Sequence, residues 1–511
     1  MRLITGKMDI NVISWLDRIS RKFPGKVVYR DAAEGQALTF AQLDRLTKSI
    51  GSGLAGRIAP GKPVAVMSGR HVLTPACYLG VVRAGCFYAP MDASMPEPRL
   101  NQILHVIHAE ILVVDREHLA KAEKLAFDGQ ILLMEELAEC PADEALLARA
   151  GRVHTELDPL YVIFTSGSTG IPKGVITSHY ALMCYLDGLQ EVIRLDETDV
   201  IGNQSPLDYI AAIRDIYLPL MTGAETVIIP KNEFAMGDRL FGTLNEYGVT
   251  TICWSTAGVE LPAKLGAFED TKPEHLRRVV FSGSVISSKY LRVWQQNLPE
   301  VTFINQYGPT EATGSCTYYT IDEEVLDDTV LPIGVPYKHY GICLLTDDDR
   351  AVPQGEVGEI CVTGPALALG YYGQPELTAK SFIQHPLNPN YGEKLYKTGD
   401  LGRFREDGQL EFLGRKDRQV KHMGHRIELD EIELHAQQVP GVEECCALYD
   451  KPKALLWLFY TGPAASKEII LYFRKNLPAF MVPRKLQQLD ELPRLPNGKK
   501  DMKALREYFG S

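Results

Sequence analysis

The feature that most constrains the fold is an abrupt change of residue type in the stretch 161–175. It reads Tyr-Val-Ile-Phe-Thr-Ser-Gly-Ser-Thr-Gly-Ile-Pro-Lys-Gly-Val, so an apolar run gives way to small, hydroxylated and glycine residues. Glycines let the backbone fold back so that successive N–H groups point at one anion. The hydroxyl groups and the lysine charge add to these donors. The stretch therefore predicts a strand that leads into a phosphate-binding loop, made of Thr165, Ser166, Gly167, Ser168, Thr169 and Lys173.

This loop differs from the Walker nucleotide-binding loop. In the Walker pattern Gly-Lys is followed by Ser or Thr and opens a helix. Here Pro172 precedes Lys173, and Gly174 follows it. For the stretch taken alone, an ordinary loop rich in turn residues is the alternative interpretation.

Around this loop, strand-like apolar runs alternate with segments of helical periodicity. In the segment 38–55, apolar residues recur three and four positions apart, and Thr39 stands at the start as a helix cap. The same criteria predict helices at 74–84, 96–108, 178–193, 427–438 and 466–475, and a helix that ends at Gly223. They predict strands at 63–67, 87–92, 111–115, 225–230, 248–254, 276–282, 443–449 and 455–460. Such alternation is typical of parallel sheet layers.

The remaining segments divide the chain into further parts. The segment 330–370 has short strands separated by turns rich in glycine, proline and aspartate, and it favours an antiparallel or barrel-like arrangement. A chain of 511 residues is too long for one hydrophobic core. Roughly the last hundred residues have the size of a small domain. The predicted fold is α/β, with a large N-terminal domain of stacked α/β sheet layers, a small barrel-like β subdomain and a small C-terminal α+β domain.

The composition is that of a globular protein. A formal net charge of −11 argues against nucleic acid and against an anionic membrane as main partners. No run approaches the roughly eighteen apolar residues of a membrane span, and residues 1–17 lack the features of a secretory signal, so we expect a cytoplasmic protein. The ten cysteines include no C-x-x-C. They indicate buried thiols in a reducing compartment rather than disulfides or a zinc site.

A second motif, 305–313, combines a turn with a hydroxyl and a carboxylate. It reads Asn-Gln-Tyr-Gly-Pro-Thr-Glu-Ala-Thr. A carboxylate beside a triphosphate acts mainly through a hard cation such as Mg²⁺, which prefers oxygen ligands. Glu311 is therefore the candidate metal ligand. A helix cap is the alternative for this string taken alone.

Two further motifs lie toward the C-terminus. In Tyr396-Lys-Thr-Gly-Asp400 the carboxylate is suited to accept hydrogen bonds from both hydroxyl groups of a ribose. An aspartate after glycine is also a common turn residue. The second motif, Pro496-Asn-Gly-Lys-Lys-Asp501, is by itself only a charged turn.

Together these motifs, spread from about residue 38 to residue 501, resemble those of the acyl-adenylate-forming superfamily, and most closely its free-standing amino-acid-activating adenylation domains. The resemblance covers nearly the whole chain. It implies ATP and Mg²⁺ as cofactors. It also implies two domains, 1–415 with the ATP and acid sites and 416–511 as a lid that carries the catalytic lysine, with Asp417 as the hinge between them.

The resemblance implies a role for each matching residue. The catalytic residues are Lys499, Thr310 and Glu311, and Lys499 reaches the acid's carboxylate and the α-phosphate. Lys500 is adjacent, but the motif spacing favours Lys499. The ATP-binding residues are those of the loop together with Asn305 and Tyr307 at the adenine, Gln306 beside them, and Asp400 and Arg415 at the ribose. This chain has Lys421-His-Met-Gly where relatives often have Lys-Ile-Arg-Gly, so contacts in the second half-reaction differ.

The substrate pocket departs from the family pattern. Relatives that take α-amino acids carry an aspartate where this chain has Ile210, and the nearby acid is Asp208. Residues two apart in an extended segment share a face and lie ~6.6–6.8 Å apart along the chain, so a displaced carboxylate fits a displaced amine. This favours a β-amino acid; a helix cap at Asp208 is the alternative. The other implied pocket residues are Tyr209, Arg214, Ser282, Gln306, Gly314 and Ser315, with Arg214 facing either a second substrate carboxylate or surface acids.

The predicted function is therefore an ATP- and Mg²⁺-dependent ligase. It makes an aminoacyl-adenylate, releases pyrophosphate and passes the acyl group to the phosphopantetheine thiol of a carrier protein in trans. The rivals are an α-amino-acid enzyme similar to D-alanine–carrier protein ligases, an acyl-coenzyme A synthetase, and a nucleotide-binding regulator without catalysis.

Overall fold

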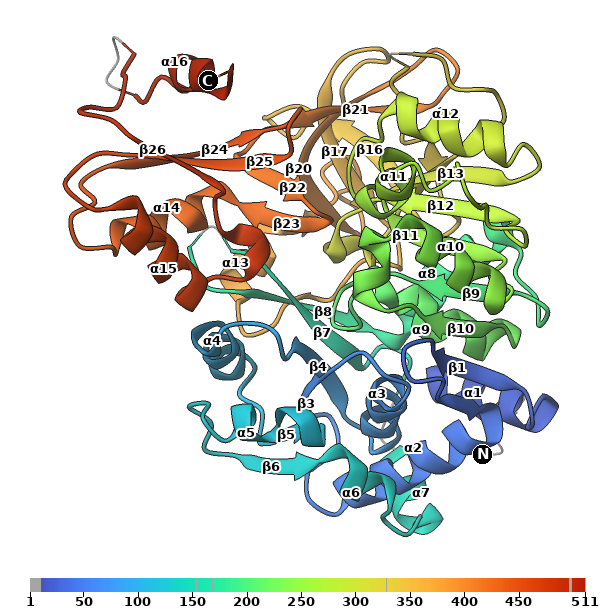
Figure 1. The fold of residues 1–511 in the computed structure, drawn as a ribbon. Coiled ribbons are helices and arrows are strands. Elements are labelled where there is room, and N and C mark those ends of the chain that lie inside the picture. The colour runs from blue at the N-terminus through green and yellow to red at the C-terminus, as the bar shows by residue number, and fades with distance from the viewer. Residues whose placement is uncertain (1–10, 152–154, 168, 328, 496–498, 511) are drawn as a thin grey trace.

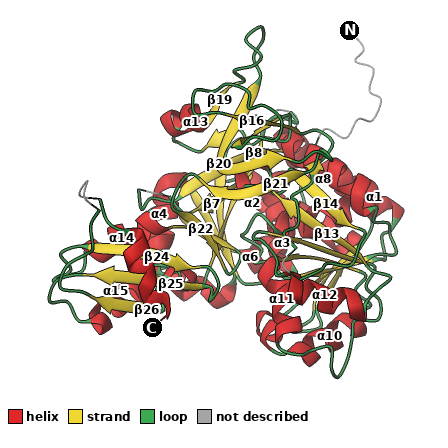
Figure 2. Ribbon diagram, turned by 90° about the horizontal axis from the view of Figure 1, so that it is seen from above, coloured by secondary structure: helices red, strands yellow, loops and turns green. Residues whose placement is uncertain are grey.

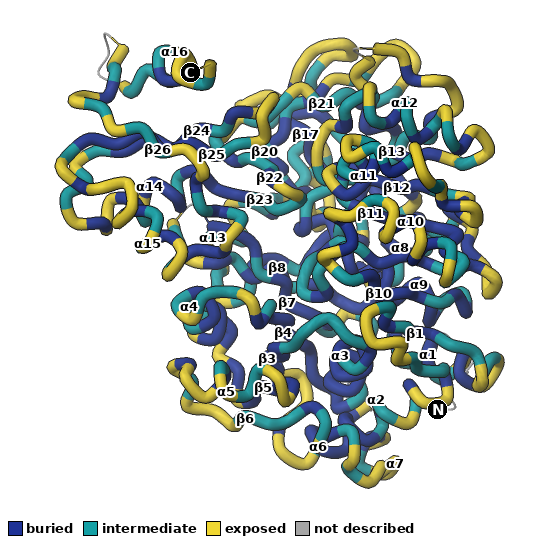
Figure 3. Tube along the Cα trace, in the orientation of Figure 1, coloured by how far each residue is buried: buried dark blue, intermediate teal, exposed yellow. Residues whose placement is uncertain are grey.

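The computed structural model describes residues 11–151, 155–167, 169–327, 329–495 and 499–510 (Figure 1). Two large sheets with their helices make up most of the molecule, and a small antiparallel sheet adjoins them. The segment 419–510, which we call the lid, stands to one side of this body, as the second view shows (Figure 2). The two large sheets are buried along most of their length, while exposed residues gather on outer helices and loops (Figure 3).

The first large sheet has nine strands and is parallel through its centre, from β1 to β13. Its central strands are short apolar runs, as expected where both faces of a parallel sheet are covered. In spatial order the strands are β15 (Val335–Pro336), β14 (Thr317–Ile321), β13 (Thr302–Tyr307), β12 (Arg278–Ser282), β11 (Thr251–Ser255), β9 (Val200–Asn203), β10 (Glu225–Ile228), β1 (Val27–Asp31) and β2 (Ala37–Thr39).

The second large sheet has seven strands, of which five are parallel. In spatial order they are β18 (Gly370–Tyr371), β8 (Lys173–Ser178), β7 (Pro159–Thr165), β4 (Phe87–Asp92), β3 (Pro63–Ser68), β5 (Ile111–Val114) and β6 (Gln130–Leu133). Strands β7 and β8 are antiparallel. The candidate phosphate loop, 166–172, therefore closes a hairpin and does not open a helix, which agrees with its difference from the Walker pattern.

One hydrophobic core joins the two large sheets, because it contains side chains of both sheets and of α2, α3, α8 and α9. The hydroxyls of Tyr88 on β4 and Tyr217 on α9 are hydrogen-bonded across it at 3.0 Å. The helices of the body are α1 (Val12–Lys22), α2 (Phe40–Ala55), α3 (Leu73–Arg83), α4 (Glu97–Ile107), α5 (Leu119–Ala122), α6 (Met134–Ala138), α7 (Glu144–Gly151), α8 (His179–Ile193), α9 (Ala212–Thr222), α10 (Gly237–Glu246), α11 (Thr256–Lys264), α12 (Ser288–Asn297) and α13 (Pro375–Ser381).

The helix boundaries follow the local signals in the sequence. Thr39 caps α2 in a full capping box with Gln42, which satisfies two free N–H groups at once. Ser178 accepts a hydrogen bond from the Ala181 amide and caps α8. Helix α9 ends at Gly223, whose φ of +87° is the left-handed conformation that favours glycine. These predicted helices are confirmed.

The small sheet confirms the predicted antiparallel subdomain, and it extends beyond residue 370 to Arg415. Its strands are β16 (Gly341–Leu345), β17 (Gly358–Thr363), β20 (Lys394–Phe404), β19 (Phe382–Gln384) and β21 (Leu410–Arg415). Strand β16 lies at the edge and β20 pairs with three neighbours. The pairing of β20 with β21 places Asp400 opposite Arg415.

The lid begins with the hairpin β22 (Gln419–His422) and β23 (His425–Glu428), followed by α14 (Leu429–Gln437). Strands β24 (Cys445–Asp450), β25 (Leu455–Tyr460) and β26 (Lys485–Gln488) form its sheet. Side chains alternate along β24 and β25. One set packs with α14 and α15 (Ser466–Asn476), and the other packs with residues around α16 (Met502–Arg506). The lid thus has its own hydrophobic cores, and the predicted large and small parts of the fold are confirmed.

Several predicted boundaries differ from the structure by two or three residues, and for two of them the cause is visible. The helix expected at 427–438 begins at Leu429, because residues 425–428 pair with β22 as a strand. The strand expected at 248–254 begins at Thr251, since Gly248 has φ of +62° and belongs to the turn before it. The division after residue 415 and the hinge at Asp417 stay predictions. Across the described ranges, no helix has the length and apolarity that a membrane crossing requires.

Gly334 offers a test of how the small sheet is joined to the first large sheet. Its φ is +86°, and a Cβ atom there would lie 1.8 Å from the carbonyl oxygen of Tyr318. We expect Gly334→Ala to lower the thermal unfolding midpoint by far more than Gly355→Ala. Gly355 has φ of +84° but open space around it, so that variant carries only the left-handed backbone cost of roughly 1–2 kcal/mol, without the overpacking cost of about 1–3 kcal/mol. Equal midpoints for the two variants would contradict this packing.

Candidate active site

The hairpin loop between β7 and β8 is shaped by glycine. Thr165 lies opposite Lys173 at its base. A Cβ atom at Gly167 would lie 2.1 Å from the carbonyl oxygen of Ile171, and Gly170 has φ of +77°, so neither position accepts another residue without strain. The hydroxyl oxygen of Thr165 is buried and has no hydrogen-bond partner among the described residues. Ser168, also predicted for this loop, lies outside the described residues.

The motif 305–313 leaves the end of β13 at the carboxyl edge of the first large sheet. The Asn305 side-chain amide donates to the carbonyl oxygen of Pro332 at 2.8 Å. The Tyr307 hydroxyl donates to Asp400 Oδ2 at 2.5 Å. Thr310 and Glu311 follow in a single 3₁₀ turn and are buried. Ligands in α/β proteins commonly bind at such carboxyl edges.

Asp400 is held from two sides. Arg415, opposite it on β21, donates from Nη1 to Asp400 Oδ1. The same guanidinium group donates to both oxygens of Asp417, at 2.6 and 2.7 Å. A carboxylate has about four lone-pair positions, so Asp400 keeps acceptor capacity for the two hydroxyls of a ribose. The structure therefore brings Asn305, Tyr307, Asp400, Arg415 and Asp417 together along one cavity of about 800 Å³.

Glu311 makes the central contact between the body and the lid. Its two oxygens each accept a hydrogen bond from Arg426 on β23, at 2.9 Å. The Tyr371 hydroxyl donates to Oε1 at 2.7 Å. Glu311 is fully buried. Burial alone would raise the pKa of Glu311, but the Arg426 guanidinium and the Tyr371 hydroxyl hold this pKa below its ordinary value, so the carboxylate is ionised and the contact is an ion pair.

Other lid residues meet the candidate phosphate loop. The Ser166 hydroxyl donates to the carbonyl oxygen of Arg426 at 2.7 Å. Lys173 lies 3.7 Å from the carboxylate of Glu428. The carboxylate of Glu431 interacts with the backbone amide of Gly167. Lid carboxylates thus contact Lys173 and the Gly167 amide, which are expected to bind phosphate. The Arg426 guanidinium is paired with the Glu311 carboxylate, which is expected to bind a metal.

This arrangement decides when Glu311 can hold a cation. Its oxygen donors suit Mg²⁺. Both oxygens are engaged by Arg426 in the present lid orientation, so a cation fits only after Arg426 withdraws.

Among the predicted pocket residues, Arg214, Gln306 and Ser315 form one hydrogen-bonded group. Arg214 is buried and donates to Gln306 Oε1 at 3.1 Å and to the Cys253 carbonyl oxygen at 2.6 Å. Ser315 donates to the same Gln306 oxygen at 3.3 Å. Pairing of Arg214 with surface acids was wrong, because the side chain lies inside the core. Of the remaining predicted residues, Ser282 is opposite Gln306 on β12, Gly314 faces the Tyr185 ring, and Ile210 is buried.

Asp208 does not cap a helix. Helix α9 begins at Ala212, and its cap residue Ala211 makes no side-chain hydrogen bond, so this alternative was wrong. Burial and the negative charge of Asp92 raise the pKa of Asp208 to about 7, against the opposing charges of Arg70 and Lys231. The neighbouring Tyr209 hydroxyl donates to the Gly424 carbonyl oxygen of the lid at 2.9 Å.

Lys499 is the predicted catalytic residue that the structure does not bring to the others. It is exposed. Helix α16, which begins three residues later, lies at the outer end of the lid, well away from the β7–β8 hairpin (Figure 1). Lys421, whose role the sequence left open, lies instead within the cavity, with Nζ 5.9 Å from the centroid of the Tyr307 ring.

Comparison with known proteins identifies the chain. Residues 16–372 match the family model described as AMP-binding enzyme. The chain belongs to the AMP-binding enzyme family. Surfactin synthase subunit 1 of Bacillus subtilis is 33% identical to it over 92% of this chain, and tyrocidine synthase 1 of Brevibacillus parabrevis is 30% identical over 95%. The chain spans 13% and 44% of the lengths of these two relatives.

Solved structures agree with the fold of an AMP-binding enzyme. Holo-PA1221, described as an NRPS protein containing adenylation and PCP domains, superposes with a TM-score of 0.84 at 22% identity, covering 98% of this chain and 84% of that one. IdnL1 superposes with a TM-score of 0.80 at 24% identity, covering 94% and 99%. The family model confirms the predicted superfamily, and its description as AMP-binding enzyme agrees with the predicted adenylate-forming ligase.

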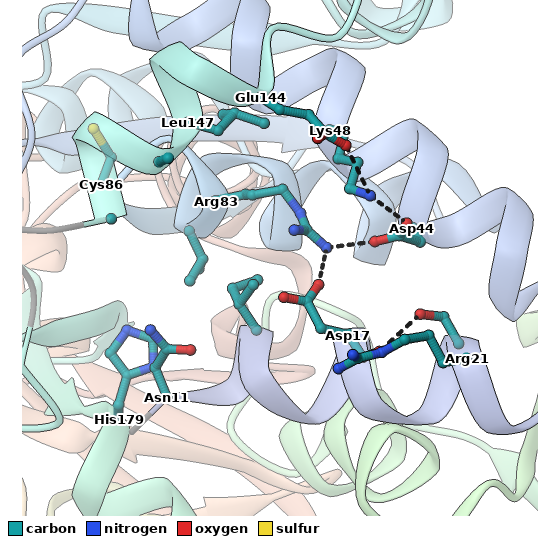
Figure 4. Close-up of a pocket in the computed structure, with 15 residues that line it drawn as sticks. Asn11, Asp17, Arg21, Asp44, Lys48, Arg83, Cys86, Glu144, Leu147 and His179 are labelled. Carbon is teal, nitrogen blue, oxygen red and sulfur yellow. Dashed lines mark hydrogen bonds and ion pairs between the residues drawn. The ribbon is translucent and has the colours of Figure 1, made fainter. Parts of the chain in front are cut away.

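A second cavity of this AMP-binding enzyme, of about 510 Å³, lies among α1, α2, α3 and α7 (Figure 4). Arg83 donates to Asp17 and Asp44 at 2.9 and 2.7 Å. Lys48 lies 2.8 Å from Asp44 and 3.6 Å from Glu144. These ion pairs connect α1, α2, α3 and α7, so the cavity is lined by a structural ion-pair network.

The Arg426–Glu311 ion pair predicts how firmly the lid is held. We expect Arg426→Ala to speed amide hydrogen exchange across β22, β23 and α14, because removing one partner of a buried pair leaves an uncompensated charge at a cost of about 3–5 kcal/mol. The matched control is Arg403→Ala, which removes an exposed pair with Glu411 and changes stability by only about 0–1 kcal/mol. Unchanged exchange in Arg426→Ala would contradict this role.

Proposed function

We propose that this AMP-binding enzyme uses ATP and Mg²⁺ to activate an amino acid as aminoacyl-AMP and then transfers the acyl group to the phosphopantetheine thiol of a separate carrier protein. The observation that carries the proposal is the convergence of residues 305–307, Asp400 and Arg415 on one cavity. The names of the relatives, which are synthases of surfactin and tyrocidine, support amino acids as substrates. The likeness to an NRPS protein with PCP domains supports a carrier protein as acceptor.

In the first half-reaction the substrate carboxylate attacks the α-phosphorus of ATP in line, and the bond to pyrophosphate breaks. Negative charge on the phosphoryl oxygens has to be neutralised. Lys173, Thr310 and the hairpin amides bind the phosphates, and Asp400 with Arg415 orients the ribose. Glu311 would hold Mg²⁺, which supplies further charge neutralisation. Lys499 contributes its charge at the α-phosphate and the substrate carboxylate after the lid turns about Asp417.

In the second half-reaction a thiol attacks the acyl carbon of the anhydride, and AMP leaves. The present lid orientation suits this step. Lys499 lies away from the site, and the groups that would hold pyrophosphate and metal are engaged by the lid. Domain movement of this kind is a common way to run two reactions in one site.

We propose a β-amino acid as the substrate, held through its ammonium group by Asp208. The support is the replacement of the expected aspartate by the buried Ile210 and the position of Asp208 beside Asp92, Arg70 and Lys231. An α-amino acid, as in D-alanine–carrier protein ligases, is the alternative within this chemistry. An acyl-coenzyme A synthetase and a regulator without catalysis are the alternatives outside it.

The deciding measurement is ATP–pyrophosphate exchange with paired α- and β-amino acids. We expect β-amino acids to stimulate exchange, and Asp208→Asn to reduce kcat/KM for them by roughly 10–100-fold, because a hydrogen bond to a charged group contributes about 1.5–3 kcal/mol. Asp238→Asn, a change of an exposed aspartate on α10, is the matched control.

The other outcomes separate the rivals. Preference for α-amino acids, or full activity of Asp208→Asn, would overturn the amine-binding role while leaving adenylation intact. Thioester formation on free coenzyme A, with no need of a carrier, would indicate the synthetase. No exchange with any acid would indicate the regulator.

The raised pKa of Asp208 predicts a pH dependence of substrate binding. Asp208 pairs with an ammonium group only when ionised, and its pKa is about 7. We expect KM for the amino acid to fall by about tenfold between pH 6 and pH 8 as the ionised fraction rises.

Asp92→Asn is the control for this pH profile. It removes the negative charge that helps to raise the pKa of Asp208, so the fall in KM should move to lower pH. A KM profile that does not move in Asp92→Asn, or that persists in Asp208→Asn, would show that another group titrates.

A further inference from the structure

Two cysteines face each other across the edge of the small sheet. The antiparallel register of β16 and β17 places Cys343 directly opposite Cys361. Residues opposite each other in such a pair have Cα atoms about 4.5 or 5.5 Å apart, with side chains on the same face. Both separations lie inside the range of roughly 4.4–6.8 Å that a disulfide spans. The two thiols also interact with each other directly.

The surroundings give the two thiols different access. Cys361 is fully buried between β16 and β20, whereas Cys343 lies on the edge strand and is only half-buried. Eight of the ten cysteines are buried, and Cys140 is the other one that is half-buried. A small oxidant in solution therefore reaches Cys343 before it reaches Cys361.

The contact between the thiols favours loss of a proton from the pair, because the remaining thiol donates a hydrogen bond to the thiolate. The thiolate is the reactive form, and Cys343 is the more accessible of the two cysteines, so Cys343 meets the oxidant first.

The two cysteines that are neighbours in the sequence, Cys445 and Cys446, are not placed to form a disulfide. Cys445 and Cys446 are neighbours on β24, but they point to opposite faces of the lid sheet and belong to different hydrophobic cores. They cannot approach each other without disrupting the strand.

We propose that Cys343 and Cys361 form an oxidation site, at which a peroxide converts the two thiols into a reversible disulfide. The Cys343 thiolate attacks one peroxide oxygen, the O–O bond breaks, and a sulfenic acid and hydroxide form. The Cys361 thiol then attacks the sulfenic sulfur, the S–S bond forms and the S–O bond breaks. The two thiols give up two electrons and two protons, and hydrogen peroxide becomes two molecules of water. A dithiol reductant reverses the change by thiol–disulfide exchange.

The site lies on the strand that supports Asp400. Cys361 is opposite Lys397 on β20. Its neighbour Ile360 accepts a hydrogen bond from Thr398 at 2.7 Å, and Glu359 accepts one from the Gly399 amide at 2.9 Å. A disulfide would pin the edge strand β16 to this support. The proposal does not depend on the substrate of the enzyme.

The experiment is peroxide treatment of the folded full chain, followed by digestion without reduction and mass spectrometry. Trypsin cleaves after Arg350, between the two cysteines, so the disulfide joins two otherwise separate peptides. We expect one dominant cross-linked product, lighter than the two peptides by two hydrogen atoms and released by dithiothreitol. The thermal unfolding midpoint should rise on oxidation and return on reduction.

Two variants decide between this site and unspecific oxidation. Cys343→Ser, a change at a half-buried edge position, should abolish both the cross-link and the shift in midpoint. Cys140→Ser, the matched control at the other half-buried cysteine, should retain both. The proposal is overturned if the folded wild type gives no Cys343–Cys361 peptide, if Cys140 and Cys343 are oxidised alike without a cross-link, or if Cys361 cross-links equally well to another cysteine in Cys343→Ser.

Discussion

The arrangement of the candidate active site depends on one ion pair, between Arg426 of the lid and Glu311 of the body. Glu311 is fully buried and the Arg426 side chain is only 14% exposed, so the pair is favourable only while its geometry is maintained. Both oxygens of Glu311 accept hydrogen bonds from Arg426, and the Tyr371 hydroxyl donates a further one. This contact fixes β23 against the body. Because β23 is fixed, Glu428 lies near Lys173 and the Gly424 carbonyl accepts a hydrogen bond from Tyr209.

The same contact explains why one set of residues serves two steps in the proposed reaction. Groups that neutralise phosphate and metal charge in the first step are neutralised by the lid in the second. In the lid orientation seen here, Glu311, Lys173 and the Gly167 amide each have a partner from the lid, and this limits the cost of moving between orientations. The alternation therefore needs no large change within the body, whose two sheets share one core.

Most of the fold could be predicted from the sequence, because the signals for helix ends and for strands are local. The capping box at Thr39, the cap at Ser178 and the left-handed Gly223 mark helix ends through bonds within a few residues. Short apolar strands are equally visible. The β22–β23 hairpin was missed because its residues are charged and its turn lies at Met423-Gly424, within a motif assigned to a loop.

The candidate site was predictable as a set of motifs but not as a geometry. Asn305, Tyr307, Asp400 and Arg415 were named from the sequence, and the structure brings them together, whereas Ser168 lies outside the described residues. Arg426 and Asp92 were missed, because their roles come from partners more than a hundred residues away in the chain. No periodicity or spacing reports such a partner. The burial of Arg214 was missed because its partners, Gln306 and Cys253, are also distant from it in the sequence.

The single core shared by the two large sheets has a consequence for how small molecules would act on this enzyme. In the proposed reaction, a compound confined to the cavity wall at Asn305 and Tyr307 would contact only the body and would compete with the nucleotide. A compound that bridged Lys173 of the hairpin and Arg426 of the lid would hold the two parts in one orientation. It would stabilise one lid orientation, and its apparent affinity would depend on the fraction of the protein that adopts this orientation.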